Sequence, residues 1–298
     1  MGLRQSVVWL HDRKGERQIS VEGYAVDPKF TPDGKKLFYR ILKGVLPFSA
    51  PGELQVVDLA SGQQEPVLPG LDITGQPRLA YDISSDGAQV VAGVQDREGR
   101  HRLWIGALEG QQPPRQITAF ESDYPHFGAD NDIFFRGFEG PSAYIYRIKR
   151  DGSGLQKVIQ QPVAGIRTVS PDGQWLIARV QEENASATIA FPLGGGAPRR
   201  LHLGAASFWN WSADRTRLYL SIETHSTSLS GRTYVIPLSA GQMLPPTADG
   251  KDKSREEFVK VPGVEVIEAF DVAAGPVPGV YAFSRESVQR NLYRIPLH

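Results

Sequence analysis

The chain has 298 residues, and its 33 Lys and Arg residues balance 33 Asp and Glu residues, so no net charge favours binding to nucleic acid or to an anionic membrane. It contains no cysteine, which excludes disulfides, thiolate catalysis and cysteine-ligated zinc or iron–sulfur sites. No stretch approaches the roughly 18 consecutive apolar residues of a membrane span, and the first residues lack the apolar run of a signal peptide, so we expect no membrane insertion by this chain.

Tight turns followed by apolar strands recur along the chain. In the most complete copy, Ser-Pro-Asp-Gly at 170–173, Pro restricts φ and Gly accepts a positive φ, and the apolar segment 175–178 follows at once, which is typical of a β-hairpin. The turn aspartates, in chain order, are Asp33, Asp86, Asp130, Asp172 and Asp214. Their spacings are 53, 44, 42 and 42 residues, and a degenerate sixth copy lies at 273–275.

A second repeated element follows each turn by about 20 residues: an alternating strand that ends at a glycine-containing turn. We interpret these elements as third strands, and the short segments after the glycines, such as 115–117 and 156–159, as fourth strands. The predicted third strands cover residues 54–59, 103–108, 144–148, 188–193, 233–238 and 292–297.

Self-similarity at a period of about 40–45 residues, with four strands in each repeat, is typical of a β-propeller. We therefore predict an all-β fold in which residues 1–298 form one propeller of six blades, each of four antiparallel strands, with seven blades as the alternative. Residues 7–19 have the form of a third and a fourth strand, and 264–298 offer a first, a second and a third. The two ends should close one blade together, which removes an open sheet edge but leaves one strand over.

Two insertions interrupt the repeat. Residues 43–52 lengthen one hairpin loop and account for the longest spacing, and residues 245–263 separate the last two blades. In the second insertion, Ser254 and Glu257 form a capping-box pattern, and Pro262 with Gly263 provides a stop signal, which together predict a short helix near 255–260. Such an insertion either covers the end of a blade or acts as a lid.

The Ser-Pro-Asp-Gly turns ahead of apolar strands resemble the WD40-like (PD40) repeats of the TolB-type β-propellers, over nearly the whole chain. Residues 8–15 and 290–297 look like the propeller regions of bacterial membrane-anchored serine/threonine kinases, although no kinase motif lies in this chain. The resemblance implies a bacterial scaffold or sensor domain, periplasmic or otherwise extracytoplasmic, that binds a protein or peptide partner. The repeat motif is specific for the architecture and says little about function.

The candidate site lies in one row of equivalent positions, with one residue from each predicted first strand. The residue two positions before each turn is polar in all six copies, and first strands line the central channel of a propeller. Trp209 borders this row. The six residues of the polar row are Lys29, Asp82, His126, Thr168, Asn210 and Asp271.

Three interpretations of this polar ring stay open. The ring can bind water only, with Lys29 and Asp82 paired across neighbouring blades. It can hold a specific small ligand. It can also hold a divalent cation, for which Asp82, His126 and Asp271 supply oxygen and nitrogen donors.

Two functions from different classes fit the sequence, and a purely structural spacer is a third possibility. We predict a non-catalytic binding module, monomeric and without a cofactor, that recognises a protein, a peptide or a small ligand. The propeller architecture, the balanced charge and the absence of a catalytic constellation, including any Gly-x-Ser-x-Gly nucleophile motif, favour this prediction. The alternative is a metal-dependent propeller hydrolase or lactonase with its site in the channel. Enzymes of that kind usually place a Glu in the ring, and the nearest one here is Glu268, three positions before Asp271.

Overall fold

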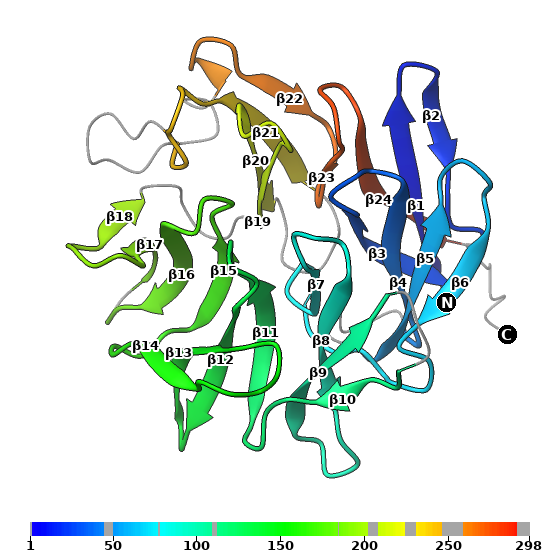
Figure 1. The fold of residues 1–298 in the computed structure, drawn as a ribbon. Helices are drawn as coiled ribbons and strands as arrows, with labels where there is room; N and C mark the ends of the chain where they lie inside the picture. The colour runs from blue at the N-terminus through cyan, green and yellow to red at the C-terminus, as the bar shows by residue number, and fades with distance from the viewer. Residues whose placement is uncertain are drawn as a thin grey trace, which may run out of the picture.

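The computed structural model describes residues 2–44, 50–76, 78–108, 112–183, 185–201, 208–223, 231–245 and 259–290. In these residues, 24 β-strands form four sheets of four strands and one sheet of eight, arranged around a common centre (Figure 1). The predicted all-β propeller architecture with antiparallel four-stranded blades is confirmed. Within the same residues, no apolar helix is long enough to cross a bilayer.

Each four-stranded sheet follows chain order from the centre of the molecule outward (Figure 1). The first and second of these sheets contain β7 (Tyr81–Ile83), β8 (Gln89–Gln95), β9 (His101–Ala107) and β10 (Arg115–Gln116), then β11 (Ser122–Phe127), β12 (Ile133–Glu139), β13 (Ser142–Ile148) and β14 (Gln156–Ile159). The third and fourth contain β15 (Gly165–Val169), β16 (Trp175–Gln181), β17 (Ser186–Pro192) and β18 (Arg199–Leu201), then β19 (Phe208–Trp211), β20 (Arg217–Glu223), β21 (Gly231–Pro237) and β22 (Glu265–Ile267).

The eight-stranded sheet consists of two groups of four strands that meet at a single parallel bridge between Ser6 and Tyr24. One group is β3 (Tyr24–Phe30), β4 (Lys36–Leu42), β5 (Gly52–Asp58) and β6 (Gln64–Val67). The other, which we call the closing group, is β23 (Ala273–Ala274), β24 (Tyr281–Arg290), β1 (Gly2–Asp12) and β2 (Gly15–Gln18).

The closing group joins the two ends of the chain. Strands β1 and β24 pair antiparallel from Gly2↔Arg290 to His11↔Tyr281. The N-terminal segment therefore provides the third and fourth strands, and the C-terminal segment provides the first and second. The competing third strand predicted at 292–297 lies outside the described residues, as do residues 45–49 of the first insertion and most of the helix expected near 255–260.

The core lies between neighbouring sheets, because both faces of each central strand are covered. In β4, Phe38 packs into a cluster with Tyr81 of the next sheet. Leu37 and Tyr39 point to the opposite face and pack with Val8 of the closing group. All three β4 side chains are at most 1% exposed, so the period of two along the strand distributes apolar residues to two cores rather than to a core and solvent.

The turn between the first and second strands satisfies its own polar groups. The Ser170 hydroxyl donates to Asp172 Oδ1 (2.5 Å) and accepts the N–H of Trp175 (2.9 Å). Gly173 completes the turn at φ 69°, a conformation that glycine adopts without strain. The same hydroxyl-to-aspartate bond is made by Thr31, Ser84 and Ser212. This chemistry determines where each first strand ends, and so which of its residues face the centre.

The turn that begins at Ser212 offers a stabilising substitution. Ala213 stands where Pro32 and Pro171 stand in the equivalent turns. Ala213→Pro is expected to raise the free energy of unfolding by about 0.4–1 kcal/mol, because Pro restricts the unfolded chain at a position whose fold already accepts it. Ser85→Pro is the contrasting variant, because the Ser85 N–H donates to Asn131 Oδ1 (3.0 Å) and would be lost. Chemical denaturation of both variants tests this, and an equal gain for both would contradict it.

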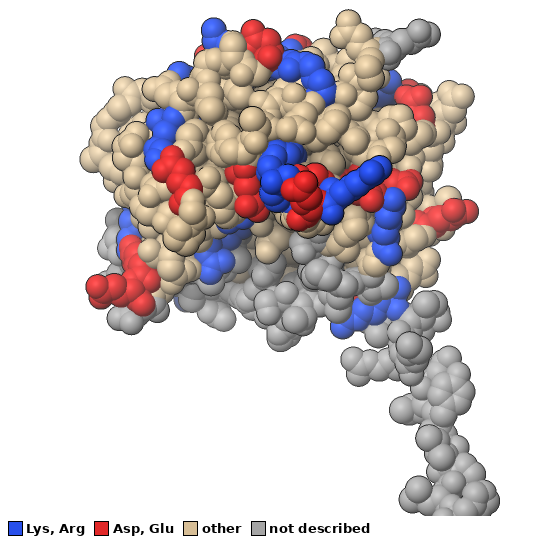
Figure 2. Space-filling view, turned by 90° about the horizontal axis from the view of Figure 1, so that it is seen from below, with Lys and Arg blue, Asp and Glu red and all other residues tan. Residues whose placement is uncertain are grey.

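Charges are mixed on the surface as the composition suggests. On the face shown in Figure 2, basic and acidic side chains lie side by side, and uncharged residues cover most of the described surface. No broad field of one sign faces solvent there.

Candidate functional site

A cavity of about 250 Å³ lies at the centre of the propeller, where the first strands meet their turns. The structure brings six of the seven predicted site residues to its wall, from five different sheets or strand groups. These are Lys29 from β3, Asp82 from β7, His126 from β11, Thr168 from β15, and Trp209 and Asn210 from β19.

The seventh residue, Asp271, does not line this cavity. In the other five turns, the N–H of the first turn residue donates to a carbonyl at the start of the second strand, as from Thr31 to Lys36 (3.0 Å). The same bond in the closing group runs from Gly275 to Val280 (2.8 Å). Counting two residues back from Gly275 gives Ala273, which therefore takes the ring position.

Asp271 instead stands four residues before its turn, as Asp27 does in β3. Both residues are fully buried and have a positive φ, 62° for Asp271 and 65° for Asp27. The predicted place of Asp271 in the ring is wrong by two residues, because the last turn, Ala-Ala-Gly at 273–275, has no aspartate to mark its register and the sequence pattern placed the turn too early.

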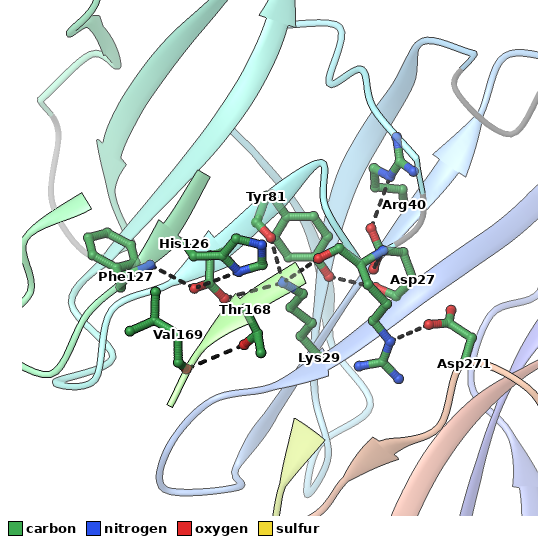
Figure 3. Close-up of polar contacts among 11 residues, drawn as sticks. Asp27, Lys29, Arg40, Tyr81, His126, Phe127, Thr168, Val169 and Asp271 are labelled. Carbon is green, nitrogen blue, oxygen red and sulfur yellow. Dashed lines mark hydrogen bonds and ion pairs between the residues drawn. The ribbon is translucent and has the colours of Figure 1, made fainter. Parts of the chain in front are cut away.

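Lys29 and Asp82 form the predicted pair across neighbouring strand groups. Lys29 Nζ donates to Asp82 Oδ1 (3.2 Å) and to the carbonyl oxygen of Tyr81 (2.5 Å). The other carboxylate oxygen of Asp82 accepts the backbone N–H of Phe127 (2.9 Å). Asp82 therefore links β3, β7 and β11 at the wall of the cavity. Figure 3 labels its partners Lys29 and Phe127, with Tyr81 and His126 beside them.

His126 lies beside this pair, with its Nδ1 3.9 Å from Asp82 Oδ2. Burial lowers the pKa of His126 to about 4, with the Lys29 charge acting in the same direction and Asp82 opposing it. The imidazole is therefore neutral at pH 7. Its Nε2 is buried and has no hydrogen-bond partner within the described part of the chain.

Arg78 is a cavity residue that the sequence pattern missed. It precedes β7, outside the polar row, and has a φ of 67°. Its backbone N–H donates to Asp27 Oδ1 (2.7 Å), and its Nε donates to Asp271 Oδ1. Its terminal nitrogens, Nη1 and Nη2, are buried and find no hydrogen-bond partner among the described residues. No local sequence signal marks this arginine.

The contacts of Arg78 continue into a layer of buried charge, of which Figure 3 labels Asp27, Arg40 and Asp271. Arg40 and Asp27 are fully buried, with Arg40 Nε 3.3 Å from Asp27 Oδ2. Arg40 also donates to the carbonyl oxygen of Gly75 (3.0 Å), and the Tyr81 hydroxyl donates to that of Asp27 (2.7 Å). Burial raises the pKa of Asp271 to about 6, opposed by Arg78 and reinforced by the charge of Asp27.

The three residues considered for a metal, Asp82, His126 and Asp271, are not assembled into one site. Asp82 faces Lys29, and Asp271 faces Arg78. Across the described ranges, no group of three or more His, Asp or Glu side chains is placed to hold a metal ion. The cationic side chains of Lys29 and Arg78, which pair with these two carboxylates, oppose a divalent cation, so the residues do not fit the metal centre of the alternative function.

Comparison with known proteins supports the architecture. No protein-family model matches the chain. Dipeptidyl-peptidase 5 of Porphyromonas gingivalis is 29% identical over 152 residues, which are 50% of this chain and only 21% of that protein. The match thus spans half of this chain and about a fifth of that relative.

Similar solved structures cover most of the chain. The "putative TolB" of Agrobacterium tumefaciens has a TM-score of 0.68 and 17% identity, covering 96% of this chain and 99% of that one. TolB from Acinetobacter baumannii has a TM-score of 0.60 and 15% identity, covering 78% and 61%. A "putative gluconolactonase" has a TM-score of 0.53 and 13% identity, covering 96% and 93%. The chain therefore has the fold of the TolB-type β-propellers.

Proposed function

We propose that this protein is a non-catalytic propeller binding module whose ligand occupies the central cavity. One observation carries the proposal: polar side chains from successive first strands converge there, and buried donor or acceptor atoms of His126 and Arg78 have no partner in the described chain. Buried polar atoms are normally hydrogen-bonded, so a ligand that satisfies them gains free energy. A cavity of about 250 Å³ accepts a small molecule, or one side chain or terminus of a peptide or protein partner.

The proposal includes the organisation of the domain. We infer that the two halves of the eight-stranded sheet act as two blades, because a single bridge joins them, and that residues 1–298 form one six-bladed, monomeric propeller. A rigid ring of this kind positions wall residues from distant parts of the sequence.

Peptide selection tests the proposed function. Random peptides displayed on phage are selected against the full chain and counter-selected on Thr168→Phe, which adds a bulky ring at the cavity wall. Ser153→Phe adds the same ring on an exposed turn and is the matched control. We expect selected peptides to bind the wild type and the control and to lose at least tenfold in affinity for Thr168→Phe. Retained binding to Thr168→Phe, or failure to select any peptide, would count against a peptide-binding cavity.

The similarity to the "putative gluconolactonase" keeps a channel hydrolase as the second candidate. The cationic side chains of Lys29 and Arg78 disfavour it, because they repel a divalent cation. Metal analysis of protein purified without chelator separates the two candidates. A stoichiometric divalent ion that is lost in Asp82→Ala would favour the hydrolase over the binding module.

A further inference from the structure

We propose that the central cavity is specific for a carboxylate attached to an apolar body, and that Arg78 is the residue that binds the carboxylate. This inference rests on the proposed function and adds the chemical class of the ligand. The carboxylate can belong to a free organic acid or to the C-terminus of a peptide, and the test distinguishes these two sources.

Arg78 has the donors that a carboxylate needs. Its guanidinium side chain is only 6% exposed and lines the cavity. Asp271 occupies Nε, which leaves Nη1 and Nη2 without a partner in the described structure. These two nitrogens form the end of the planar fork, a geometry that matches the two oxygens of a carboxylate.

Lys29 does not compete for this role. An ammonium group has three N–H donors. In the structure they are directed to three acceptors: the carbonyl oxygens of Tyr81 (2.5 Å) and Arg78 (3.4 Å), and Asp82 Oδ1 (3.2 Å). Lys29 therefore contributes its charge to the cavity but no further hydrogen bond.

The charged side chains at the cavity wall favour an anionic ligand. Lys29, Arg78 and Arg167 line the cavity together with one carboxylate, that of Asp82. In a site of low dielectric, the cationic wall attracts an anion more strongly than it would in water. The neutral His126 imidazole adds no charge to this wall at pH 7.

The rest of the wall favours an apolar body. Phe127, Trp209 and Trp211 line the cavity together with Ile83 and Val169. Trp209 and Trp211 also lie against each other, with ring centroids 6.2 Å apart. An aromatic or branched aliphatic group attached to the carboxylate would contact these residues.

The backbone conformation around Arg78, and the hydrogen bonds that hold it, fix the position of this side chain. Asp27, Arg78 and Asp271 each have a positive φ, and the three are joined by hydrogen bonds. Non-glycine residues in this conformation cost free energy and cluster at binding sites, where surrounding contacts enforce them. Asp27 and Asp271 are therefore positioning residues for the Arg78 fork.

The experiment is calorimetric titration of the full chain with phenylacetate, its neutral analogue phenylacetamide, inorganic phosphate, and a Gly-Phe peptide with either a free or an amidated C-terminus. We expect saturable phenylacetate binding and at least tenfold weaker binding of the amide and of phosphate. Arg78→Lys keeps the charge but removes the fork, and it should weaken phenylacetate binding at least tenfold. Arg217→Met, which removes an arginine outside the cavity wall, should leave it unchanged.

The arms of the test separate the possible outcomes. Tight binding of the free-terminus peptide but not of phenylacetate assigns the carboxylate to a peptide, and the reverse assigns it to an organic acid. Equal binding of acid and amide, or unchanged binding by a folded Arg78→Lys, overturns the inference. If Arg78→Lys does not fold, Arg78→Met/Asp271→Asn, which removes both charges, replaces it. If peptides selected against the cavity bind and are lost in Thr168→Phe while no carboxylate is preferred, only this inference fails.

Discussion

Asp27→Ala is expected to lower the free energy of unfolding by about 3–5 kcal/mol, because it leaves the charge of Arg40 buried without its partner. Both side chains are fully buried, and Arg40 Nε lies 3.3 Å from Asp27 Oδ2. The substitution also removes the acceptor of the Arg78 N–H and places Ala at a φ of 65°. Equilibrium denaturation in guanidinium chloride, followed by tryptophan fluorescence, measures the change.

Two controls sharpen this prediction. Asp72→Ala removes an aspartate from an exposed pair with Lys43 and should leave the free energy of unfolding unchanged within error. Asp27→Leu/Arg40→Met removes both buried charges and should recover part of the loss, because an apolar pair leaves no uncompensated ion. A loss below about 1 kcal/mol for Asp27→Ala would mean that Arg40 reaches water, contrary to the structure.

The second large effect is on acid stability. His126 has a pKa of about 4 in the folded protein, below its ordinary value of 6.5, so the unfolded chain takes up the proton first as pH falls. The stability that the buried neutral imidazole contributes is therefore complete above pH 6.5 and is lost as pH falls toward 4. The loss amounts to about 3 kcal/mol by pH 4. The variant His126→Gln should not show this loss of free energy of unfolding. Denaturation curves of the wild type and the variant at pH 7 and pH 4 measure the difference.

Asp271 acts in the opposite direction over the same pH range. Its pKa is raised to about 6 from 3.8, so the folded protein binds this proton first, and acidification from pH 6 to pH 4 favours the fold through this group. The two effects offset each other in the wild type. Compared with the wild type, His126→Gln should gain stability on acidification and Asp271→Asn should lose it. Parallel pH profiles for the three proteins would contradict both assignments.

The turn motifs explain why the architecture and most of the cavity wall could be predicted from the sequence. Each Ser/Thr–Asp turn satisfies its polar groups within a few residues, as Ser170 and Asp172 do, so its conformation depends on local sequence. Because side chains alternate along a strand, counting back from the turn identifies the residue that faces the centre. This counting placed Lys29, Asp82 and His126 on one wall.

The same counting could not find Arg78 or place Asp271. Arg78 precedes its strand in an irregular segment, and its partner Asp271 is 193 residues away in the sequence. The turn after Asp271 lacks the aspartate that the other five turns contain, so its register is identified by the bond from Gly275 to Val280. Likewise, two segments offered a third strand for closure, and the pairing of β1 with β24 decided in favour of the N-terminal one.

The sequence by itself determined the all-β repeat, the turns and the polar row of the first strands, because these depend on contacts between residues close in the chain. Only the tertiary structure decided how the ends close, which carboxylate pairs with which arginine, and that Arg78 presents two unpartnered nitrogens to the cavity within the described part of the chain. Those features depend on contacts between strands far apart in the sequence. The strength of these ion pairs and hydrogen bonds depends on how deeply they are buried, and burial cannot be read from a local sequence pattern.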